Sequence, residues 1–362
     1  MSDATHSEVP AWLRELGKIV AALAIALLVT VILVLLVSDE PGKALRTLAT
    51  APLSSKRTFG LLVDDTAKLT LAGLGFALVF QARQFALGVQ GQAYVGGLAA
   101  ALVALSPIGV TIWSIPLGIL AAMAAGSVLG FIPGWAKARF GASEIVSSLM
   151  LNYIAIRTVN YIVRAHLAPE GSGHLMSPKF DPISIYPAII ARTRFDIGII
   201  IALLTAFLIW FLLYRTRWGL KLRLVGQNAR FAEYSGIEAR KVMITSMTLA
   251  GAIGGLLGAV FVQGRAFGRI ATDFDGLLAF EGIIVSMVVK DRPHLIPVAA
   301  FGYGYLRQGA QFMGIRSDVP SELIAVVQAI VIILVISSFT LPGQRFLARL
   351  FSRKQPEAQE AR

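Results

Sequence analysis

The chain contains no cysteine, only four histidines and few charged side chains. The lack of cysteine excludes disulfides and thiolate metal sites, and it is compatible with either side of a bacterial membrane. His6, His166, His174 and His294 show no H-x-x-x-H or H-E-x-x-H spacing, so a zinc peptidase would lack its ligands. The phosphate-binding motif G-x-x-x-x-G-K-[ST] and the nucleophile elbow G-x-S-x-G are also missing. We therefore expect no ATP hydrolysis and no enzymatic activity from this chain.

The chain is instead rich in hydrophobic residues, which make up 56% of it against 15% charged, and its mean hydropathy is +0.71. A soluble domain of this length needs a more charged surface. Apolar runs of about 20 residues, long enough to cross a bilayer as helices, recur along the chain. The sequence therefore predicts an all-α polytopic membrane protein with about ten transmembrane helices. The expected spans are 19–37, 66–82, 85–105, 112–132, 144–163, 195–214, 242–262, 276–289, 294–313 and 322–340.

The distribution of lysine and arginine predicts the orientation of these spans. Segments rich in Lys and Arg stay in the cytoplasm, and they alternate here with segments that hold fewer and mix them with Asp, Glu and Pro. This bias predicts that both termini are cytoplasmic. Most of the net charge of +12 then reflects the Lys and Arg residues of cytoplasmic segments, with anionic lipid headgroups as their partner. It does not indicate nucleic-acid binding.

The expected organisation is a single transmembrane domain over residues 1–341 and a basic cytoplasmic tail over 342–362. Two long periplasmic loops, 38–65 and 164–194, and one long cytoplasmic loop, 215–241, interrupt the spans. Spans two to five and seven to ten are equal in number and would run in opposite directions, which is compatible with an inverted repeat.

The cytoplasmic loop RTRWGLKLRLVGQNARFAEYSGIEARK is predicted to contain a short helix. Asn228 suits its N-cap, Ala229 to Ser235 its body, and Gly236 the position after its end. Phe231 and Tyr234, three positions apart, would share one face. From the pattern alone, this helix could contact another protein or lie on the lipid surface.

The stretch FALGVQGQAYVGG places two glutamines, Gln90 and Gln92, inside an apolar run. An unsatisfied amide in an apolar medium costs roughly 2–7 kcal/mol, so both side chains must face protein, water or substrate. Glycines in the same stretch permit a close helix approach or a helix break, or simply pack as small residues. They are Gly88, Gly91, Gly96 and Gly97.

Polar residues also form two stripes on the span 144–163. Ser148 and Asn152 stand one turn apart, and Glu144 suits the N-terminal end of the helix. The second stripe consists of Tyr153, Arg157 and Tyr161. Such a helix is expected to face the bundle and not the lipid.

Two charged residues, Glu281 and Arg307, fall inside expected spans. An acidic residue well inside a span costs about 2.5–3.5 kcal/mol, so each needs a partner or a wet cavity. One or both could line a transport pathway. The alternative is an interhelical salt bridge with no role in transport.

Taken together, these stretches resemble the permease subunits of ABC importers for nucleosides and simple sugars, in the branched-chain amino acid/ribose/nucleoside permease family. The motifs that carry the resemblance to the nucleoside branch are FALGVQGQ, EIVSSLMLNYI, LRLVGQNARFAEYSGI, FEGIIVSMVVK, LRQGA and VPSEL. They cover nearly the whole chain in order. The third motif and LMLNYI are the most specific of them.

The resemblance implies that 1–341 is a permease domain in the bacterial inner membrane and that 215–241 carries a coupling helix for a separate cytoplasmic ATPase. That ATPase would use ATP, and this chain would bind no cofactor. A second homologous permease chain, an external substrate-binding lipoprotein and membrane lipids are the other implied partners. The residues implied in coupling are Gln227, Asn228, Arg230, Phe231, Tyr234 and Gly236.

The resemblance also favours purine nucleosides as cargo, with a simple sugar such as ribose or galactose as the alternative. The residues expected to line the pathway are Gln90, Gln92, Asn152, Glu281 and Arg307. Ala86 and Gln90 stand where the family has Asn and Glu, which leaves the substrate open. A different class of function, an ion-coupled secondary transporter, would use Glu281 as its coupling carboxylate.

Overall fold

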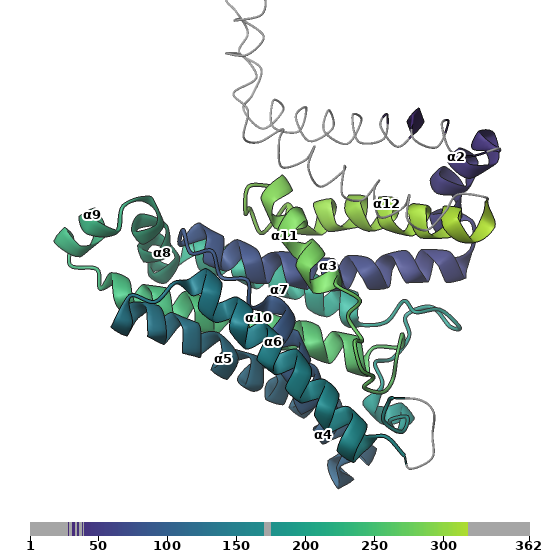
Figure 1. The fold of residues 1–362 in the computed structure, drawn as a ribbon, viewed down its shortest axis with the longest axis horizontal. Helices are drawn as coiled ribbons and strands as arrows, with labels where there is room; N and C mark the ends of the chain where they lie inside the picture. Colours follow the sequence, from purple (N-terminus) through teal and green to yellow (C-terminus); the bar gives the residue numbers. More distant parts are fainter. Residues whose placement is uncertain are drawn as a thin grey trace, which may run out of the picture. The chain divides into compact units, whose positions relative to one another are not determined.

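Figure 1 shows the computed structural model of the chain, which describes residues 40–169 and 175–317 together with Leu28, Val31, Ile32, Leu35 and Ser38. The expected last span and the basic tail lie outside these residues, as does most of the expected first span. The chain divides into two compact units, one formed by Arg46–Phe312 and the other by Met1–Leu45 with Met313–Arg362. The following description concerns the unit Arg46–Phe312.

Helices make up the regular structure of the described residues, apart from two isolated β-bridges. All eight expected spans that fall in this part of the chain coincide with a helix. The α-helices are α2 (Pro41–Thr50), α3 (Lys56–Gln81), α4 (Val89–Leu105), α5 (Ser114–Phe140), α6 (Glu144–Ile162), α7 (Gly198–Arg215), α8 (Arg217–Gln227), α9 (Ala229–Tyr234), α10 (Ala239–Gln263), α11 (Leu278–Val288) and α12 (Ile296–Arg316). Short helical turns are η1 (Ala51–Leu53), η2 (Pro107–Val110), η3 (Val163–Leu167) and η4 (Pro182–Ser184).

Much of the expected loop 38–65 is helical, because it contains α2 and the first turns of α3. A capping box starts α3: the Ser55 hydroxyl accepts from the Thr58 backbone N–H at 3.1 Å, and the Thr58 hydroxyl accepts from the Ser55 N–H at 3.1 Å. Charged residues in the first half of α3 lower the hydropathy there. The span expected from the sequence therefore starts at residue 66, whereas α3 starts at Lys56.

Helix α10 forms the centre of the unit and packs against α4 and α5. In its most apolar 18-residue window, 78% of the residues are buried, against 22% for α5 and 28% for α7. Glycines make this packing close: a Cβ atom on Gly96 of α4 would lie 2.4 Å from the Gly255 Cα of α10. Small residues thus let the helix backbones touch, as in membrane helix pairs, which confirms the expected close approach at Gly96.

Three of the described helices, α5, α7 and α10, are long and apolar enough to cross a membrane, and α4 and α11 are shorter apolar helices. Helix α11 has 11 residues and a length of about 16 Å, roughly half of what a bilayer requires. An irregular segment precedes it, with positive φ angles at Asp273, Gly276 and Leu277. The expected span 276–289 is therefore a half-length helix behind a non-helical entry segment.

Helices α8 and α9 lie together at one end of this unit, at the left of Figure 1, while the segments that follow α6 and α10 lie at its opposite end. The predicted caps of α9 are confirmed. The Asn228 side chain accepts from the Phe231 N–H at 3.1 Å, and Gly236 has a φ of +77°. The helix ends one residue earlier than predicted, at Tyr234.

A candidate transport pocket

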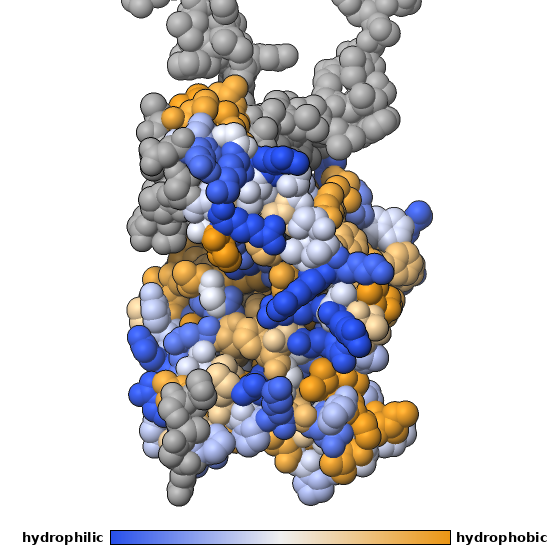
Figure 2. Space-filling model, turned by 90° about the vertical axis from the view of Figure 1, so that its right-hand side faces the viewer, coloured by the Kyte–Doolittle hydropathy of each residue, from blue (hydrophilic) through white to orange (hydrophobic). Residues whose placement is uncertain are grey.

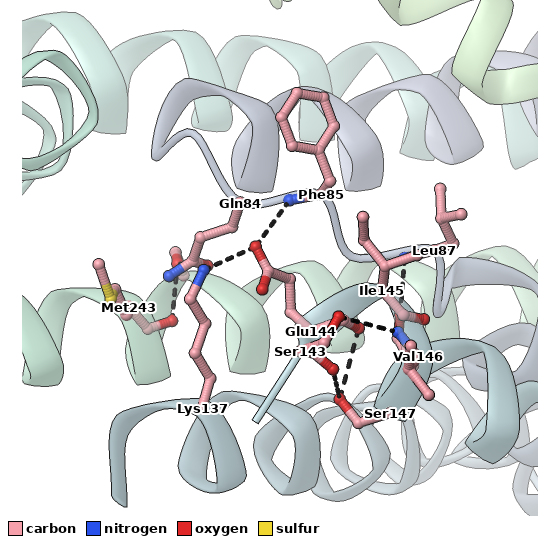
Figure 3. Close-up of polar contacts among 12 residues, drawn as sticks. Gln84, Phe85, Leu87, Lys137, Ser143, Glu144, Ile145, Val146, Ser147 and Met243 are labelled. Atoms are coloured by element: carbon pink, nitrogen blue, oxygen red, sulfur yellow. Dashed lines mark hydrogen bonds and ion pairs between the residues drawn. The ribbon is translucent and has the colours of Figure 1, made fainter. Parts of the chain in front are cut away.

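The non-helical segment between α3 and α4 is fixed to the start of α6 (Figure 3). The Leu87 N–H donates to the Ser148 hydroxyl at 2.9 Å, and the Phe85 N–H approaches the Glu144 carboxylate at 3.4 Å. Glu144 also forms an ion pair of 2.6 Å with Lys137 near the end of α5. The position of Glu144 at the helix start, in contact with backbone and with a lysine, agrees with the structural role predicted for it.

Asn152 joins α6 to the first turn of α4. Its Oδ1 accepts from the Gly91 N–H at 2.7 Å, and its Nδ2 donates to the Leu87 carbonyl at 2.6 Å. A side chain on Gly91 would collide with this amide, since its Cβ would lie 2.6 Å from Asn152 Oδ1. The pairing of Asn152 with the glycine-rich stretch is therefore a built contact between two of the motifs that the sequence analysis singled out.

Gln90 and Tyr94, one turn apart on α4, both donate to one carboxylate. Gln90 Nε2 lies 3.0 Å from Asp275 Oδ2, and the Tyr94 hydroxyl lies 2.9 Å from Asp275 Oδ1. The Tyr94 ring also stacks on Phe274 at a centroid distance of 4.5 Å. Asp275 is buried in the entry segment of α11, and no lysine or arginine in the described part of the chain forms an ion pair with it.

These groups face a pocket of about 400 Å³ between α4, α6 and the entry segment of α11. Gln90 and Asn152 line it together with Asp275, as do two residues of the second polar stripe of α6, Tyr153 and Arg157. Tyr153 is 65% exposed, so the pocket opens on the outer face of α6. Of the five residues expected on the pathway, the structure places two here.

Glu281 and Arg307 lie elsewhere, in an ion-pair cluster with a residue of α3. Arg307 Nη1 is 2.9 Å from Asp65 Oδ2, and Arg307 Nε is 2.9 Å from Glu281 Oε2. Gln308 Nε2 donates to the same Asp65 oxygen at 3.2 Å. The cluster joins α3, α11 and α12, and none of its members lines the pocket. Its geometry is that of the interhelical salt bridge, the alternative that the sequence left open.

Gln92, the fifth expected residue, points away from the pocket. It is buried, and it packs so closely on α10 that a Cβ on Gly254 would lie 2.7 Å from its Oε1. That oxygen has no hydrogen-bond partner among the described residues. Gln90 and Gln92 therefore occupy different environments, although both were expected to line the pathway.

Sequence reasoning missed Asp65, Tyr94 and Asp275. Asp65 and Asp275 stand in segments that hydropathy assigned to a loop or to a span boundary, and Tyr94 reads as an ordinary apolar residue. Asp275 supplies a carboxylate next to Gln90, the position where the family resemblance led us to expect one. The two residues lie far apart along the chain, so the sequence pattern did not connect them.

Three apolar helices long enough to cross a membrane, α5, α7 and α10, indicate a multi-pass membrane protein. Comparison with protein families identifies it more closely: residues 59–336 match the family model described as the branched-chain amino acid transport system/permease component. The chain belongs to this family of ABC transporter permeases.

Individual relatives support this membership. The chain is 37% identical over 291 residues, 78% of its length and 82% of the relative's, to the guanosine ABC transporter permease protein NupP of Bacillus subtilis. It is 28% identical to the nucleoside ABC transporter permease protein NupB of Lactococcus lactis, with 88% and 90% of the two chains covered. It is 26% identical to the glucose ABC transporter permease protein TsgB13 of Haloferax volcanii, with 91% and 89% covered.

Proposed function

We propose that this chain is the transmembrane subunit of an ATP-driven importer of nucleosides, with purine nucleosides as the favoured cargo. Membership of the permease family and the similarity to guanosine and nucleoside permeases support the class. The observation that carries the cargo assignment is the Asp275 carboxylate, which lies beside Gln90 and Tyr94 in an open pocket and has no ion-pair partner in the described part of the chain.

The chemistry of the pocket suits a neutral ligand with N–H donors and an aromatic face. A carboxylate accepts hydrogen bonds from ring and amino N–H groups of a purine, and hydrogen bonds to a charged group contribute about 1.5–3 kcal/mol. Tyr153 at the rim offers a ring for stacking, which contributes about 1–3 kcal/mol per base in single-stranded nucleic-acid complexes. The pocket volume of about 400 Å³ lies in the range of small-molecule sites.

The outer face of α6 supports the proposal that a second permease chain completes this pathway. Tyr153 and Tyr161 are each 65% exposed, and Arg157 is exposed between them. An arginine in a spanning helix is costly against lipid and faces protein or water instead. The pathway would then run along this polar stripe, between the two chains.

The end of the unit that holds α8 and α9 is proposed to be cytoplasmic, because basic residues cluster there. Phe231 is 58% exposed and Tyr234 is 92% exposed on the face of α9. Exposed aromatic side chains on a short, well-capped helix suit insertion into a partner protein, and the partner proposed is the cytoplasmic ATPase. ATP would be used by that subunit, and this chain would bind no cofactor.

In this topology the chain has about ten spans, both termini face the cytoplasm of a bacterial cell, and an external lipoprotein delivers the substrate. Gln227, Asn228 and Arg230 would help to place α9 against the ATPase, and Gly236 would end it. These assignments rest on the family resemblance and on the exposed faces described above.

The test is reconstitution of this chain with its partner ATPase, second permease chain and binding protein in liposomes. We expect uptake of purine nucleosides that requires ATP and exceeds the uptake of ribose or glucose. Uptake of a sugar in preference to every nucleoside would support the sugar alternative. Uptake by this chain alone, driven by an ion gradient and independent of ATP, would identify a secondary transporter and contradict the proposal.

A second test concerns α9. Phe231→Ala with Tyr234→Ala should leave the chain folded and inserted, but ATPase capture by the purified permease should fall at least tenfold. Leu220→Ala, which truncates another exposed side chain near the same end, is the matched control and should retain capture. Equal capture by both variants would show that α9 is not the coupling helix.

A further inference from the structure

Phe274 stands between the two aspartates of the entry segment of α11. Asp273 and Asp275 both line the pocket, whereas Phe274 does not line it and is only 6% exposed. The ring of Phe274 is therefore buried directly behind the carboxylate that the proposed function assigns to the substrate. This position raises the question of what the ring does for its neighbour.

Phe274 belongs to a stack of three aromatic rings. It stacks on Tyr94 of α4 at a centroid distance of 4.5 Å, and the ring of Phe261 from α10 meets it at a steep angle at 5.4 Å. Both are arrangements that aromatic pairs favour. Figure 2 looks at the end of the molecule where the segments after α6 and α10 lie, and hydrophilic side chains spread over the middle of that face. None of the three rings is more than 6% exposed, so they form part of the interior.

Gly97 leaves the space on α4 that the edge of the Phe274 ring fills. A Cβ atom on Gly97 would lie 3.1 Å from Phe274 Cζ and 3.0 Å from Val262 Cγ2. Carbon atoms in favourable contact are about 3.5–4.0 Å apart, so a methyl group at this position would push the ring aside. Gly97, which the sequence marked as a small residue inside an apolar run, thus acts as a notch for one particular side chain.

A buried ion pair supports the far end of the stack. Lys68 of α3 pairs with Asp64 at 2.7 Å, and their side chains are 3% and 4% exposed. The Lys68 ammonium also lies 4.8 Å from the centroid of the Phe261 ring, within the range of a cation–π interaction. Three helices, α3, α4 and α10, therefore hold the rings against which Phe274 packs.

The residue before Phe274 is held from the opposite side, by α6. Asn160 Nδ2 donates to Asp273 Oδ1 at 2.9 Å, and the Asp273 N–H donates to Asn160 Oδ1 at 3.3 Å. Asp273 has a φ of +49°, a backbone conformation that residues other than glycine seldom adopt. The backbone that leads into Asp275 is thus fixed on two sides, by this pair and by the buried ring.

We propose that Phe274 is a positioning residue for transport: its ring, seated in the notch at Gly97 between Tyr94 and Phe261, sets the place of the Asp275 carboxylate in the pocket. A binding group that is preorganised in this way loses less freedom when the ligand arrives. Such groups need to be held within about 0.5 Å of their productive position by the packing behind them. The inference rests on the proposed function, because it concerns the same pocket.

The first experiment measures uptake of a purine nucleoside at low concentration by the assembled transporter in liposomes. Gly97→Ala displaces the ring and Phe274→Leu shortens it, so each should lower uptake about fivefold. Together they should bring uptake back to within about twofold, because the added methyl group takes the space that the ring leaves. Gly302→Ala on α12, where a Cβ would meet no atom within 4 Å, is the matched control and should leave uptake within about twofold.

A double-variant comparison separates positioning from general packing. In a transporter that carries Asp275→Asn, Gly97→Ala should change the remaining uptake less than about twofold, because the group that the ring positions has already lost its charge. A fivefold fall both with and without the Asp275 carboxylate would assign Gly97 to packing alone and overturn the proposal. Two single variants without any recovery in their combination would overturn it as well.

A chemical probe reports the position of residue 275 independently of uptake. The chain has no cysteine, so Asp275→Cys adds its one thiol, and alkylation by a small water-soluble reagent can be scored on this chain by mass. The rate should rise at least about fivefold when Gly97→Ala is added and stay within about twofold with Gly302→Ala. Equal rates in both would contradict the proposal. Nucleoside uptake by the unchanged transporter tests the proposed function separately, so the two failures can be told apart.

Discussion

Two buried polar clusters of this protein look alike in the sequence and differ in the structure. The pocket cluster joins Gln90 and Tyr94 to Asp275, and no lysine or arginine among the described residues forms an ion pair with this carboxylate. The ion cluster joins Arg307 to Asp65 and Glu281 through two contacts of 2.9 Å. The first faces a cavity, whereas the second joins α3, α11 and α12, and none of its members lines that cavity.

This difference suggests that the pocket cluster serves ligand binding and that the ion cluster serves stability. In the ion cluster the charged groups pair with one another, so none is available to a ligand. Removing one member leaves the others largely buried and without that partner. A cluster with an unneutralised carboxylate at a cavity keeps a strong acceptor available. Variants in the ion cluster should change stability, and variants in the pocket cluster should change transport.

The largest effect is expected for Arg307→Met. It takes from the largely buried carboxylates of Asp65 and Glu281 the arginine that pairs with both, and breaking a buried pair by removing one partner costs about 3–5 kcal/mol. The yield of folded protein in detergent and its unfolding temperature should both fall sharply. Asp65→Asn combined with Glu281→Gln and Arg307→Gln should recover stability and nucleoside uptake. Stable protein without uptake from that triple variant would instead assign the cluster to the pathway.

The next effect is expected for Asp275→Asn, which keeps the shape of the side chain and removes its charge. Loss of a hydrogen bond to a charged group, about 1.5–3 kcal/mol, corresponds to roughly a tenfold to hundredfold loss of uptake at low substrate concentration. The unfolding temperature should stay close to that of the unchanged protein. Uptake at the unchanged rate would remove Asp275 from the pathway.

Gln90→Leu should have a smaller effect of the same kind. It removes one donor to Asp275, and a hydrogen bond to a charged group contributes at least about 1.5 kcal/mol, so uptake should fall about tenfold. Purine nucleosides should be affected more than ribose, because the base is the part expected to use Asp275. A uniform loss for every substrate would point to a structural role for Gln90.

The smallest effect is expected for Gln92→Met, which is the comparison variant for Gln90→Leu. Its Oε1 is buried without a hydrogen-bond partner, so replacement by a flexible apolar side chain of similar length should leave uptake within about twofold and stability equal or higher. A loss as large as that of Gln90→Leu would contradict the separation of the two glutamines.

Much of the fold could be predicted from the sequence. Hydropathy predicted a helix at each of the expected spans in the described part of the chain, because the bilayer demands long apolar helices. The caps of α9 could be predicted from Asn228 and Gly236, since capping depends on neighbours along the chain. Boundaries were less predictable: charges in the first half of α3 masked its start, and the entry segment of α11 was predicted as part of a span.

The candidate site was predictable only in part. The sequence marked Gln90, Asn152, Glu281 and Arg307 as polar groups that need partners, because burial of an unpaired polar group is costly wherever it occurs. It did not identify those partners. Asp275 lies 185 positions along the chain from Gln90, and Asp65 lies 242 positions from Arg307, so no local pattern joins them.

By itself, then, the sequence determined that this protein is a helical membrane permease, where its helices lie and which residues could not face lipid. Those properties follow from hydrophobicity and from the local rules of helix ends, which act residue by residue. Only the tertiary structure decided which polar residues meet. The arrangement of α4, α6 and the entry segment of α11 brings Asp275 to Gln90 beside a pocket. The arrangement of α3, α11 and α12 brings Arg307 to Asp65 and Glu281 as an ion-pair cluster.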